Sequence, residues 1–338
     1  METLAAGVWR SMTSVRPDSR KISHGGGNRA LMWWVPLCLL RLIWLCLRGR
    51  VEYVLCGDAL MNSLCAPILR LFGVRRFTMV MGLDVTYEQR FYRSLVHPRL
   101  RSAEHVIAIS QATADATASI GVRADRLSVL RLGVSTPGQT PDHATARALL
   151  VSRLGLDADK QVLLTLGRLV PRKGVRWFVD EVLPRLPDSV HYAIAGAGPE
   201  LDAIRDAADR RGVADRCHLL GNVDDEYREV LMRGCEIFVQ PNVAVPGDME
   251  GFGLVTVEAA MRDTLVVAAD LEGIKDAVIP ESTGFLLESA DPDAWVLKLR
   301  ELLASPVTTE EQGVRFGAEA RRVYSDLAMG TALAKLLG

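Results

Sequence analysis

The sequence predicts an α/β protein built from two doubly wound domains, each a parallel sheet covered by helices. Three observations predict this fold class: the chain length, the alternation of short apolar runs with helical segments, and a polar stretch that separates two such series. The 338 residues exceed one ordinary domain, since domains usually hold about 100–200 residues. Apolar residues make up 49% and charged residues 24% of the chain, so it can bury a large core and is not of the disordered class.

The first series contains four short apolar runs, which predict the strands Val51–Cys56, Arg76–Met81, His105–Ile109 and Leu127–Leu130. Helical patterns lie between them. Ser110 is a predicted N-cap, because its hydroxyl can accept a backbone N–H of the helix expected through Ile120. Short strands that alternate with helices are typical of a parallel sheet.

The second series predicts six strands: Gln161–Leu166, His191–Ala195, Cys217–Leu220, Glu236–Val239, Thr264–Ala268 and Gly284–Leu287. Residues 135–149 are rich in Pro, Thr and small polar residues, which is typical of a linker. We therefore expect a first domain over residues 1–135, a linker over 136–150, a second domain over 151–320 and a C-terminal helix over 321–338 that crosses back to the first domain. Two such domains would face a cleft, with ligands bound at the carboxyl ends of the strands.

The formal net charge of -1 gives no overall field that would attract nucleic acid, so we expect no nucleic-acid partner. The charge is unevenly placed. Residues 1–135 hold 18 basic and 9 acidic residues, whereas residues 136–338 hold 22 and 32. A basic half is typical either of solvated arginines or of contact with an anionic surface or substrate, and both interpretations stay open here.

The most apolar run, Leu31–Leu47, is short for a membrane span and contains Pro36 and Arg41. An arginine at the centre of a span costs about 2.5–3.5 kcal/mol. We predict a buried helix of the first domain. The alternative is a helix on a membrane surface, because tryptophan and arginine suit the headgroup layer. The residues that favour this alternative are Trp33, Trp34, Trp44, Arg29, Arg41, Arg48 and Arg50.

The chain starts without the apolar segment of a signal peptide, and its six cysteines show no CxxC spacing. We expect a cytoplasmic protein with buried thiols, with peripheral contact to the inner membrane face as the alternative. No histidine has a catalytic or metal-binding spacing, and His105, His191 and His218 are predicted to be structural. The Asp-x-Asp sequence at 157 lies before a strand and not after one, so we interpret it as a turn, and we interpret the one at 291 as a helix start. We expect no metal and no resident cofactor.

Polar motifs follow the predicted strands of the second domain. After Gln161–Leu166 comes GRLVPRKG, in which Gly167 allows a tight turn and Arg168 and Lys173 supply two cations beside a helix start. Such a pair suits a diphosphate, although two unrelated surface charges give the same pattern. After the next strand, the turn GAGP contains Gly198, and it is common to nucleotide sites and to ordinary β-to-α turns.

A third motif, EGFGLVTVE, follows the strand Glu236–Val239 and places seven residues between Glu250 and Glu258. Its glycines let backbone N–H groups approach a sugar or an anion closely. We expect Glu258 about two turns into the following helix. A carboxylate there can accept two hydroxyl hydrogen bonds, as ribose recognition requires.

Together these motifs resemble the retaining glycosyltransferases of family 4, which have the GT-B fold. The GR…P-x-K-G signature, the G-x-G-P turn and the E-x7-E motif occur in the family's order, and the resemblance extends from about Ser110 to the C-terminus. It implies that Arg168 and Lys173 hold the diphosphate of a nucleotide-sugar donor. It also implies that Glu250 and nearby amides hold the sugar. The implied donor-binding set is Gly167, Gly198, Gly251, Phe252, Gly253, Leu254 and Glu258, with Glu258 on the ribose.

The first domain departs from the family pattern at two places. No strand with a glycine-rich loop precedes residue 30, so we expect the opening βα units of the acceptor-side domain to be missing or remodelled. In addition, the turn that often holds a histidine has Met81 in its place, and methionine can neither donate a hydrogen bond nor carry charge. Gly82 and Asp84 remain as the expected acceptor-side residues.

The resemblance implies a metal-independent hexosyltransferase that moves a sugar to a glycan, a lipid-linked sugar or a small molecule with retention of configuration. The family mechanism is front-face attack, and the implied catalytic residues are Arg168, Lys173 and Glu250, the two cations stabilising the charge that grows on the diphosphate. The alternative is a degenerate or truncated member that binds a nucleotide sugar or a protein partner without catalysis. A dinucleotide oxidoreductase is excluded, because the GxGxxG motif of the first βα unit is missing.

Overall fold

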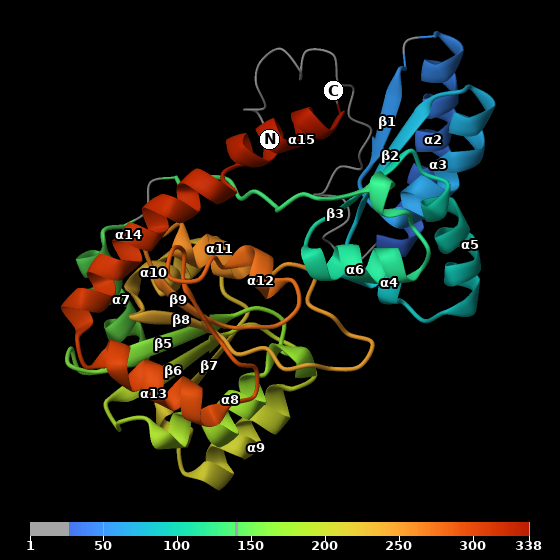
Figure 1. The fold of residues 1–338 in the computed structure, drawn as a ribbon. Helices are drawn as coiled ribbons and strands as arrows, with labels where there is room; N and C mark the ends of the chain where they lie inside the picture. Colours follow the sequence, from blue (N-terminus) through green and yellow to red (C-terminus); the bar gives the residue numbers. More distant parts are fainter. Residues whose placement is uncertain (1–26, 50, 139–140, 338) are drawn as a thin grey trace. The chain divides into compact units, whose positions relative to one another are not determined.

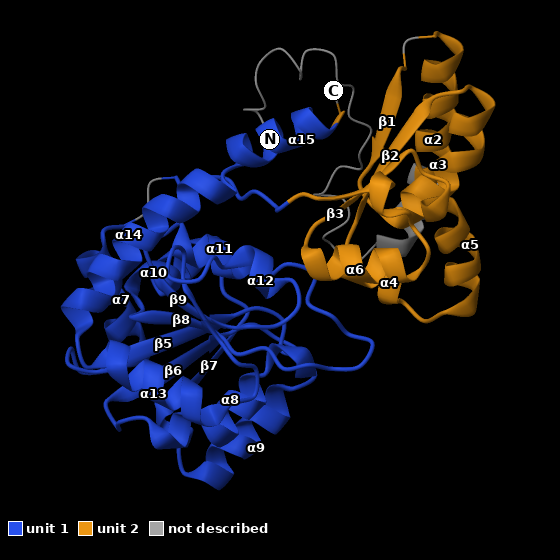
Figure 2. Cartoon of the chain, viewed as in Figure 1, with its two compact units in different colours: residues 1, 131–336 blue, residues 2–130, 337–338 orange. Residues whose placement is uncertain are grey.

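The computed structural model describes residues 27–49, 51–138 and 141–337, with side chains from residue 35 onward (Figure 1). The chain divides into two compact units. The described residues up to Leu130 form the first unit, and Arg131–Leu336 form the second (Figure 2). Each unit has a fully parallel sheet with helical crossovers, so the predicted α/β class with two parallel-sheet domains is confirmed.

The sheet of the first unit has the order β1-β2-β3-β4. Its strands are β1 (Tyr53–Cys56), β2 (Arg75–Val80), β3 (His105–Ala108) and β4 (Leu127–Val129), each within two residues of its predicted bounds. The helices are α2 (Gly27–Leu47), α3 (Ala59–Leu71), α4 (Gly82–Thr86), α5 (Arg90–Arg101) and α6 (Gln111–Ser119). The predicted cap of α6 is confirmed, because Ser110 Oγ accepts the backbone N–H of Thr113 at 3.1 Å.

The sheet of the second unit has the order β10-β9-β8-β5-β6-β7. The chain runs from β5 outward to β7, then returns to start again at β8 on the other side of β5. This reversal is a topological switch point, where ligands of open parallel sheets bind. The six strands are β5 (Gln161–Leu166), β6 (Val190–Ala195), β7 (Cys217–Gly221), β8 (Ile237–Gln240), β9 (Leu265–Ala269) and β10 (Phe285–Leu287).

Helices cover both faces of the second sheet (Figure 1): α7 (His143–Leu154), α8 (Val175–Glu181), α9 (Leu201–Arg211), α10 (Asp225–Gly234), α11 (Leu254–Ala260), α12 (Ile274–Ala277), α13 (Pro292–Leu303) and α14 (Pro306–Tyr324). The last helix, α15 (Asp326–Leu337), follows α14 and does not cover the sheet. The largest core cluster joins the strands to α8, α9 and α13. Phe178, Tyr192 and Trp295 are fully buried there, and the indole N–H of Trp295 donates to the Glu288 carbonyl at 3.0 Å. The core therefore fixes the positions of the strand ends that carry the motifs.

The structure corrects two predicted segments. The linker expected to reach residue 150 is shorter, because α7 already begins at His143, where the Asp142 carboxylate caps the backbone N–H of Thr145. The prediction of a single C-terminal helix over 321–338 is also wrong. Ser325 adopts an extended backbone and pairs with Val134, so this segment is shared between α14 and α15.

Helix α2 has a buried side and an exposed side, so the predicted buried helix describes only one of them. Leu42 and Cys46 are buried against α3, while Leu40 and Trp44 are exposed. The side chains of Arg29, Trp33 and Trp34, and the whole of Arg50, lie outside the described residues. None of the helices in the described ranges is long and apolar enough to cross a membrane.

The cysteines and histidines have the structural roles that the sequence predicts. All six cysteines are free thiols, five of them buried. His105 Nε2 lies 2.8 Å from Ser128 Oγ of the neighbouring strand. His191 on β6 and His218 on β7 stack on one another, with Nδ1 and Nε2 3.0 Å apart. Burial lowers the pKa of both rings in this pair.

The histidine pair predicts a loss of stability in acid. The pKa of each ring is below the unfolded value of 6.5, so the unfolded chain binds protons first as the pH falls. The contribution of this pair to the free energy of unfolding is fully present above pH 6.5. It decreases below that pH, by up to about 1.4 kcal/mol per pH unit for each ring that stays neutral in the folded state. Urea unfolding of wild type and His191→Gln at pH 7.5 and 5.5 checks this. A wild-type loss no larger than that of the variant would contradict it.

Candidate functional site

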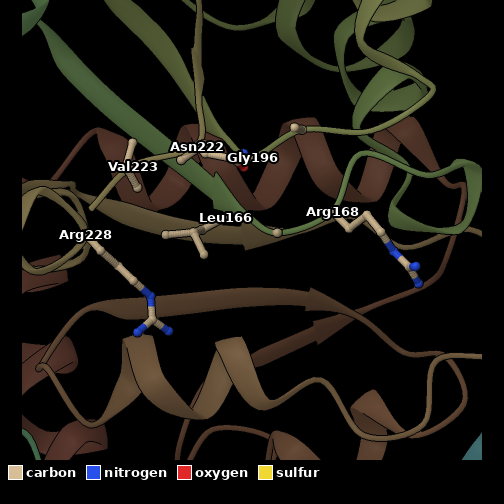
Figure 3. A pocket seen from close by; sticks show the side chains of 9 residues that line it. Leu166, Arg168, Gly196, Asn222, Val223 and Arg228 are labelled. Atoms are coloured by element: carbon tan, nitrogen blue, oxygen red, sulfur yellow. The ribbon is translucent and has the colours of Figure 1, made fainter. Parts of the chain in front are cut away.

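A hollow of about 350 Å³ lies at the carboxyl ends of β5, β6 and β7, beside the switch point. Its lining residues are Leu166, Gly167, Arg168, Ala195, Gly196, Ala197, Asn222, Val223 and Arg228. Figure 3 shows Arg168 and Arg228 at opposite ends of the hollow, with Leu166 between them. The volume is within the range of small-molecule sites, about 300–1,000 Å³.

Close packing of two backbone turns forms the floor of the hollow. A Cβ at Gly196 would lie 1.8 Å from the Gly167 carbonyl oxygen, and one at Gly198 would lie 2.2 Å from the Leu169 carbonyl oxygen. Only glycine allows this approach. Gly167 and Gly196 thus line the hollow, as a nucleotide turn requires, whereas Gly198 packs beneath the turn and is not among the lining residues.

Arg168 extends from the end of β5 into solvent at one end of the hollow. Within the described residues, its guanidinium makes no ion pair or hydrogen bond. An exposed guanidinium next to a glycine turn can bind two oxygens of a phosphate group at once. Arg168 is therefore an exposed cation at the hollow.

Glu250 lies at the centre of a buried cluster of charges below this end of the site. Its Oε2 accepts from Arg172 Nη1 at 2.5 Å, from Lys173 Nζ at 2.5 Å and from Asn242 Nδ2 at 3.0 Å. Arg172 Nε also donates to Asp248 at 2.9 Å. Three donors on one carboxylate oxygen hold Glu250 in a fixed orientation.

Burial and charge act in opposite directions on this cluster. Burial alone would raise the pKa of Glu250, but Lys173 and Arg172 outweigh it and lower the pKa. Burial lowers the pKa of Lys173, against the opposing effect of Glu250. Glu250 is therefore an ionised acceptor at neutral pH, and among the described residues its second oxygen, Oε1, accepts no hydrogen bond.

The loop from Glu250 to Leu254 is largely buried. The Phe252 ring is buried against Tyr324, whereas Leu254 is exposed at the start of α11. The Glu272 carboxylate accepts the backbone N–H of Glu250 at 2.6 Å, and Glu272 adopts a left-handed backbone, with φ of 47°. Such a conformation is costly for a residue other than glycine, and it is typical of residues that position a site.

Glu258 lies little more than one turn into α11, instead of the expected two, because α11 begins only at Leu254. Its Oε2 accepts a hydrogen bond from Arg228, which lines the hollow. Burial raises the pKa of Glu258, and the charges of Arg228 and Arg262 oppose this shift. Glu258, the carboxylate expected to hold ribose, is thus connected to the hollow by its contact with Arg228. Arg228 lies at the end of the hollow opposite Arg168 (Figure 3).

The expected acceptor-side residues belong to the first unit. Asp84 caps the start of α4, where its Oδ2 accepts the backbone N–H of Met81 at 2.8 Å. Its Oδ1 accepts the hydroxyl of Tyr92 at 3.5 Å, and burial raises the pKa of Asp84. Gly82 is buried in the same turn. These contacts give Asp84 and Gly82 a structural role within the first unit.

Sequence reasoning missed six residues of the site: Arg172, Asn222, Val223, Arg228, Asn242 and Glu272. Arg172 stands in the same PRKG stretch as Lys173, so the third cation was the available signal. Asn222 and Val223 directly follow β7, and the rule that ligands bind at strand ends would have found them. Arg228 lies inside a helix and carries no sequence signal.

The arrangement suits an anionic ligand with hydroxyl groups. Cations stand at both ends of the hollow. The carboxylate of Glu258 contacts the lining residue Arg228, and that of Glu250 contacts Lys173, which packs beside Gly167. In the part of the chain that the structure describes, no group of three or more His, Cys, Asp or Glu side chains is placed to hold a metal ion.

Two parallel-sheet units, one of them with a cationic hollow at its switch point, agree with the GT-B fold of the solved structures that the chain resembles. The family described as "Glycosyl transferases group 1" matches residues 148–323, and the chain belongs to this family. The match covers every lining residue of the hollow, together with Glu250 and Glu258.

Two kinds of relatives are similar to the chain. A GDP-mannose-dependent alpha-(1-6)-phosphatidylinositol monomannoside mannosyltransferase of Mycolicibacterium smegmatis is 30% identical over 85% of this chain and 76% of its own length. A D-inositol 3-phosphate glycosyltransferase of Xylanimonas cellulosilytica is 32% identical over 71% of this chain, which spans 58% of that relative.

Solved structures agree on the fold. Anabaena Alr3699/HepE in complex with UDP has a TM-score of 0.75 at 20% identity, covering 89% of this chain and 81% of that one. A sucrose-phosphate synthase from Thermosynechococcus elongatus has a TM-score of 0.73 at 21% identity, covering 92% of this chain and 79% of that one.

Proposed function

We propose that this glycosyltransferase uses a nucleotide-diphosphate sugar as donor and transfers its sugar with retention of configuration and without a metal. The observation that carries the proposal is the hollow with exposed Arg168 at one end and the Arg228–Glu258 pair at the other. The exposed cation at the first end suits the diphosphate of the donor, and the carboxylate at the second end suits its ribose. The named relatives support it, because one is described as GDP-mannose-dependent and a solved neighbour holds UDP.

In this proposal, Arg168 binds the diphosphate, and Lys173 lies close enough to share the charge that develops as the glycosidic bond breaks. The ideal Cβ position of Gly167 is 4.0 Å from Lys173 Cε, so the Lys173 side chain packs against the turn that contains Gly167 and Arg168. Preorganised cations of this kind stabilise a leaving diphosphate without rearranging. Glu250 Oε1 and the amides of Gly251–Leu254 bind the sugar hydroxyls.

The proposed acceptor is a glycan or a lipid-linked sugar. The basic excess of residues 1–135 supports an anionic acceptor or surface. The relative described as acting on a phosphatidylinositol monomannoside supports the lipid-linked choice. We also propose that the chain works in contact with a membrane surface, from the side that faces the cytoplasm.

A thermal-shift screen against GDP-mannose, UDP-glucose and ADP-glucose tests the donor proposal. A donor at about 100 times its Kd should stabilise the fold by about 2.7 kcal/mol. Glu258→Gln should abolish the shift, whereas Glu301→Gln, on an exposed helix face, should keep it. No shift with any donor, from a well-folded sample, would contradict the proposal.

Met81 favours a second candidate, a member that binds donor without transfer, because its side chain cannot donate a hydrogen bond to the sugar. Incubation with the donor that gives the shift separates the two. Slow release of free sugar and nucleoside diphosphate supports the enzyme, since water can replace the acceptor. A stabilising donor that stays intact favours the binding protein.

A further inference from the structure

The outer side of α2 carries a continuous stripe of large apolar side chains. The exposed fractions are 64% for Leu37, 63% for Leu40, 48% for Trp44 and 69% for Leu47. Spacings of three and four residues place them on one side of the helix, together with exposed Arg41 and Arg48. We call these six residues the α2 face.

The packing of α2 fixes the direction of this face. On the opposite side of the helix, Cys38, Leu42 and Cys46 are buried, the last two in one cluster with Leu69 of α3. The helix cannot turn its exposed leucines inward without exposing this cluster. A stripe of four large apolar residues thus stays in contact with solvent, which is unusual unless a partner binds it.

Both charged residues of the face are arginines, and the nearby acidic residue Glu52, beyond the end of the helix, pairs with Arg75 at 3.4 Å. The Arg48 guanidinium stacks on the Trp44 ring, 3.7 Å from its centroid, and α2 contains no acidic residue. Because β1 and β2 are parallel and directly follow α2 and α3, both helices end at the same edge of the sheet. Exposed Arg70 and Leu71, at the end of α3, therefore extend the same pattern at that edge.

We propose that the α2 face docks on the surface of an anionic lipid bilayer, with its leucines and Trp44 among the acyl chains and its arginines at the phosphates. Leucine, tryptophan and flanking arginine on one side of a helix suit this layer. A second copy of the chain fits less well. A twofold contact through this face would bring the arginines of one copy close to the arginines of the other, with no acid on the helix to pair with them.

The α2 face is the surface that makes the membrane contact of the proposed function, and this inference rests on that proposed contact. Its test is sedimentation with vesicles of phosphatidylcholine alone or mixed with phosphatidylglycerol. Leu40→Gln, Trp44→Gln and Leu47→Gln are combined in a face variant, and Arg41→Gln and Arg48→Gln in a charge variant. The control variant combines Leu297→Gln, Val307→Gln and Val314→Gln, which are equally exposed in the second unit.

The wild type and the control should sediment with phosphatidylglycerol vesicles, and the face variant should bind at least about tenfold more weakly. The charge variant should lose about fivefold per arginine, and added salt should weaken the wild type. A wild type that stays in the supernatant, or a face variant that binds as well as the control, would overturn the proposal. So would a wild-type dimer in light scattering that only the face variant dissociates.

The donor-induced thermal shift, measured in the same variants, keeps the two proposals separate. It should be the same in the wild type, the face variant and the charge variant, which also shows that the variants fold. Binding to vesicles without any donor shift would support the membrane surface while contradicting the proposed donor.

Discussion

Replacing Glu250 with alanine is expected to lower the free energy of unfolding by about 3–5 kcal/mol, because it leaves the ammonium of Lys173 and part of the Arg172 charge buried without a counter-ion. The side chains of all three residues are only 10–11% exposed. Removing one partner of such a buried ion pair costs far more than removing a surface pair. Urea unfolding followed by circular dichroism at pH 7.5 measures the change.

Glu301→Ala is the control for this experiment, since Glu301 pairs with Lys298 on an exposed helix face. Its effect should be within about 1 kcal/mol. A double-mutant cycle adds Lys173→Met, which removes the buried charge. If Glu250 stabilises the fold through that charge, Glu250→Ala should cost clearly less in the Lys173→Met background. Equal costs in both backgrounds would contradict the ion-pair account.

Replacing Arg168 with methionine is expected to leave the fold unchanged and to reduce the rate of sugar transfer or donor hydrolysis by about 10²–10³-fold. The guanidinium is exposed and makes no contact within the described residues, so the native state loses little. Its proposed role is to stabilise negative charge that grows on the diphosphate, and methionine keeps the length of the side chain without that charge. Product release from the donor, measured at saturation, reports the effect.

Arg176→Met serves as the matched control, because Arg176 is an exposed arginine of the neighbouring helix α8 with only a surface ion pair to Asp180. It should keep the wild-type rate. An Arg168→Met protein with nearly the wild-type rate would remove Arg168 from the mechanism, whatever the outcome for Glu250.

The sequence by itself determined the order and type of the elements. All ten strands lie within two residues of their predicted bounds, because each is a short apolar run between polar segments, and that pattern is local. The caps of α6 and α13 were also local: Ser110 and Asp291 accept hydrogen bonds from backbone groups only two or three residues ahead.

Elements whose ends depend on distant partners were predicted less well. The break at Ser325 arises from pairing with Val134, far away in the sequence, and no pattern near residue 325 reports it. The two sides of α2 were likewise undecided, because the run is apolar all round. Only packing against α3 determines which leucines are buried.

The motif residues of the site were evident in the sequence, but their partners were not. Two cations and two glutamates at strand ends indicated a diphosphate and hydroxyl site, and the structure places Arg168 at the hollow. That Lys173 contacts Glu250, and that Arg228 contacts Glu258, depends on residues 77 and 30 positions apart. Only the tertiary structure decides such contacts, because the sheet brings its strand ends together at one edge while a sequence motif records only neighbours along the chain.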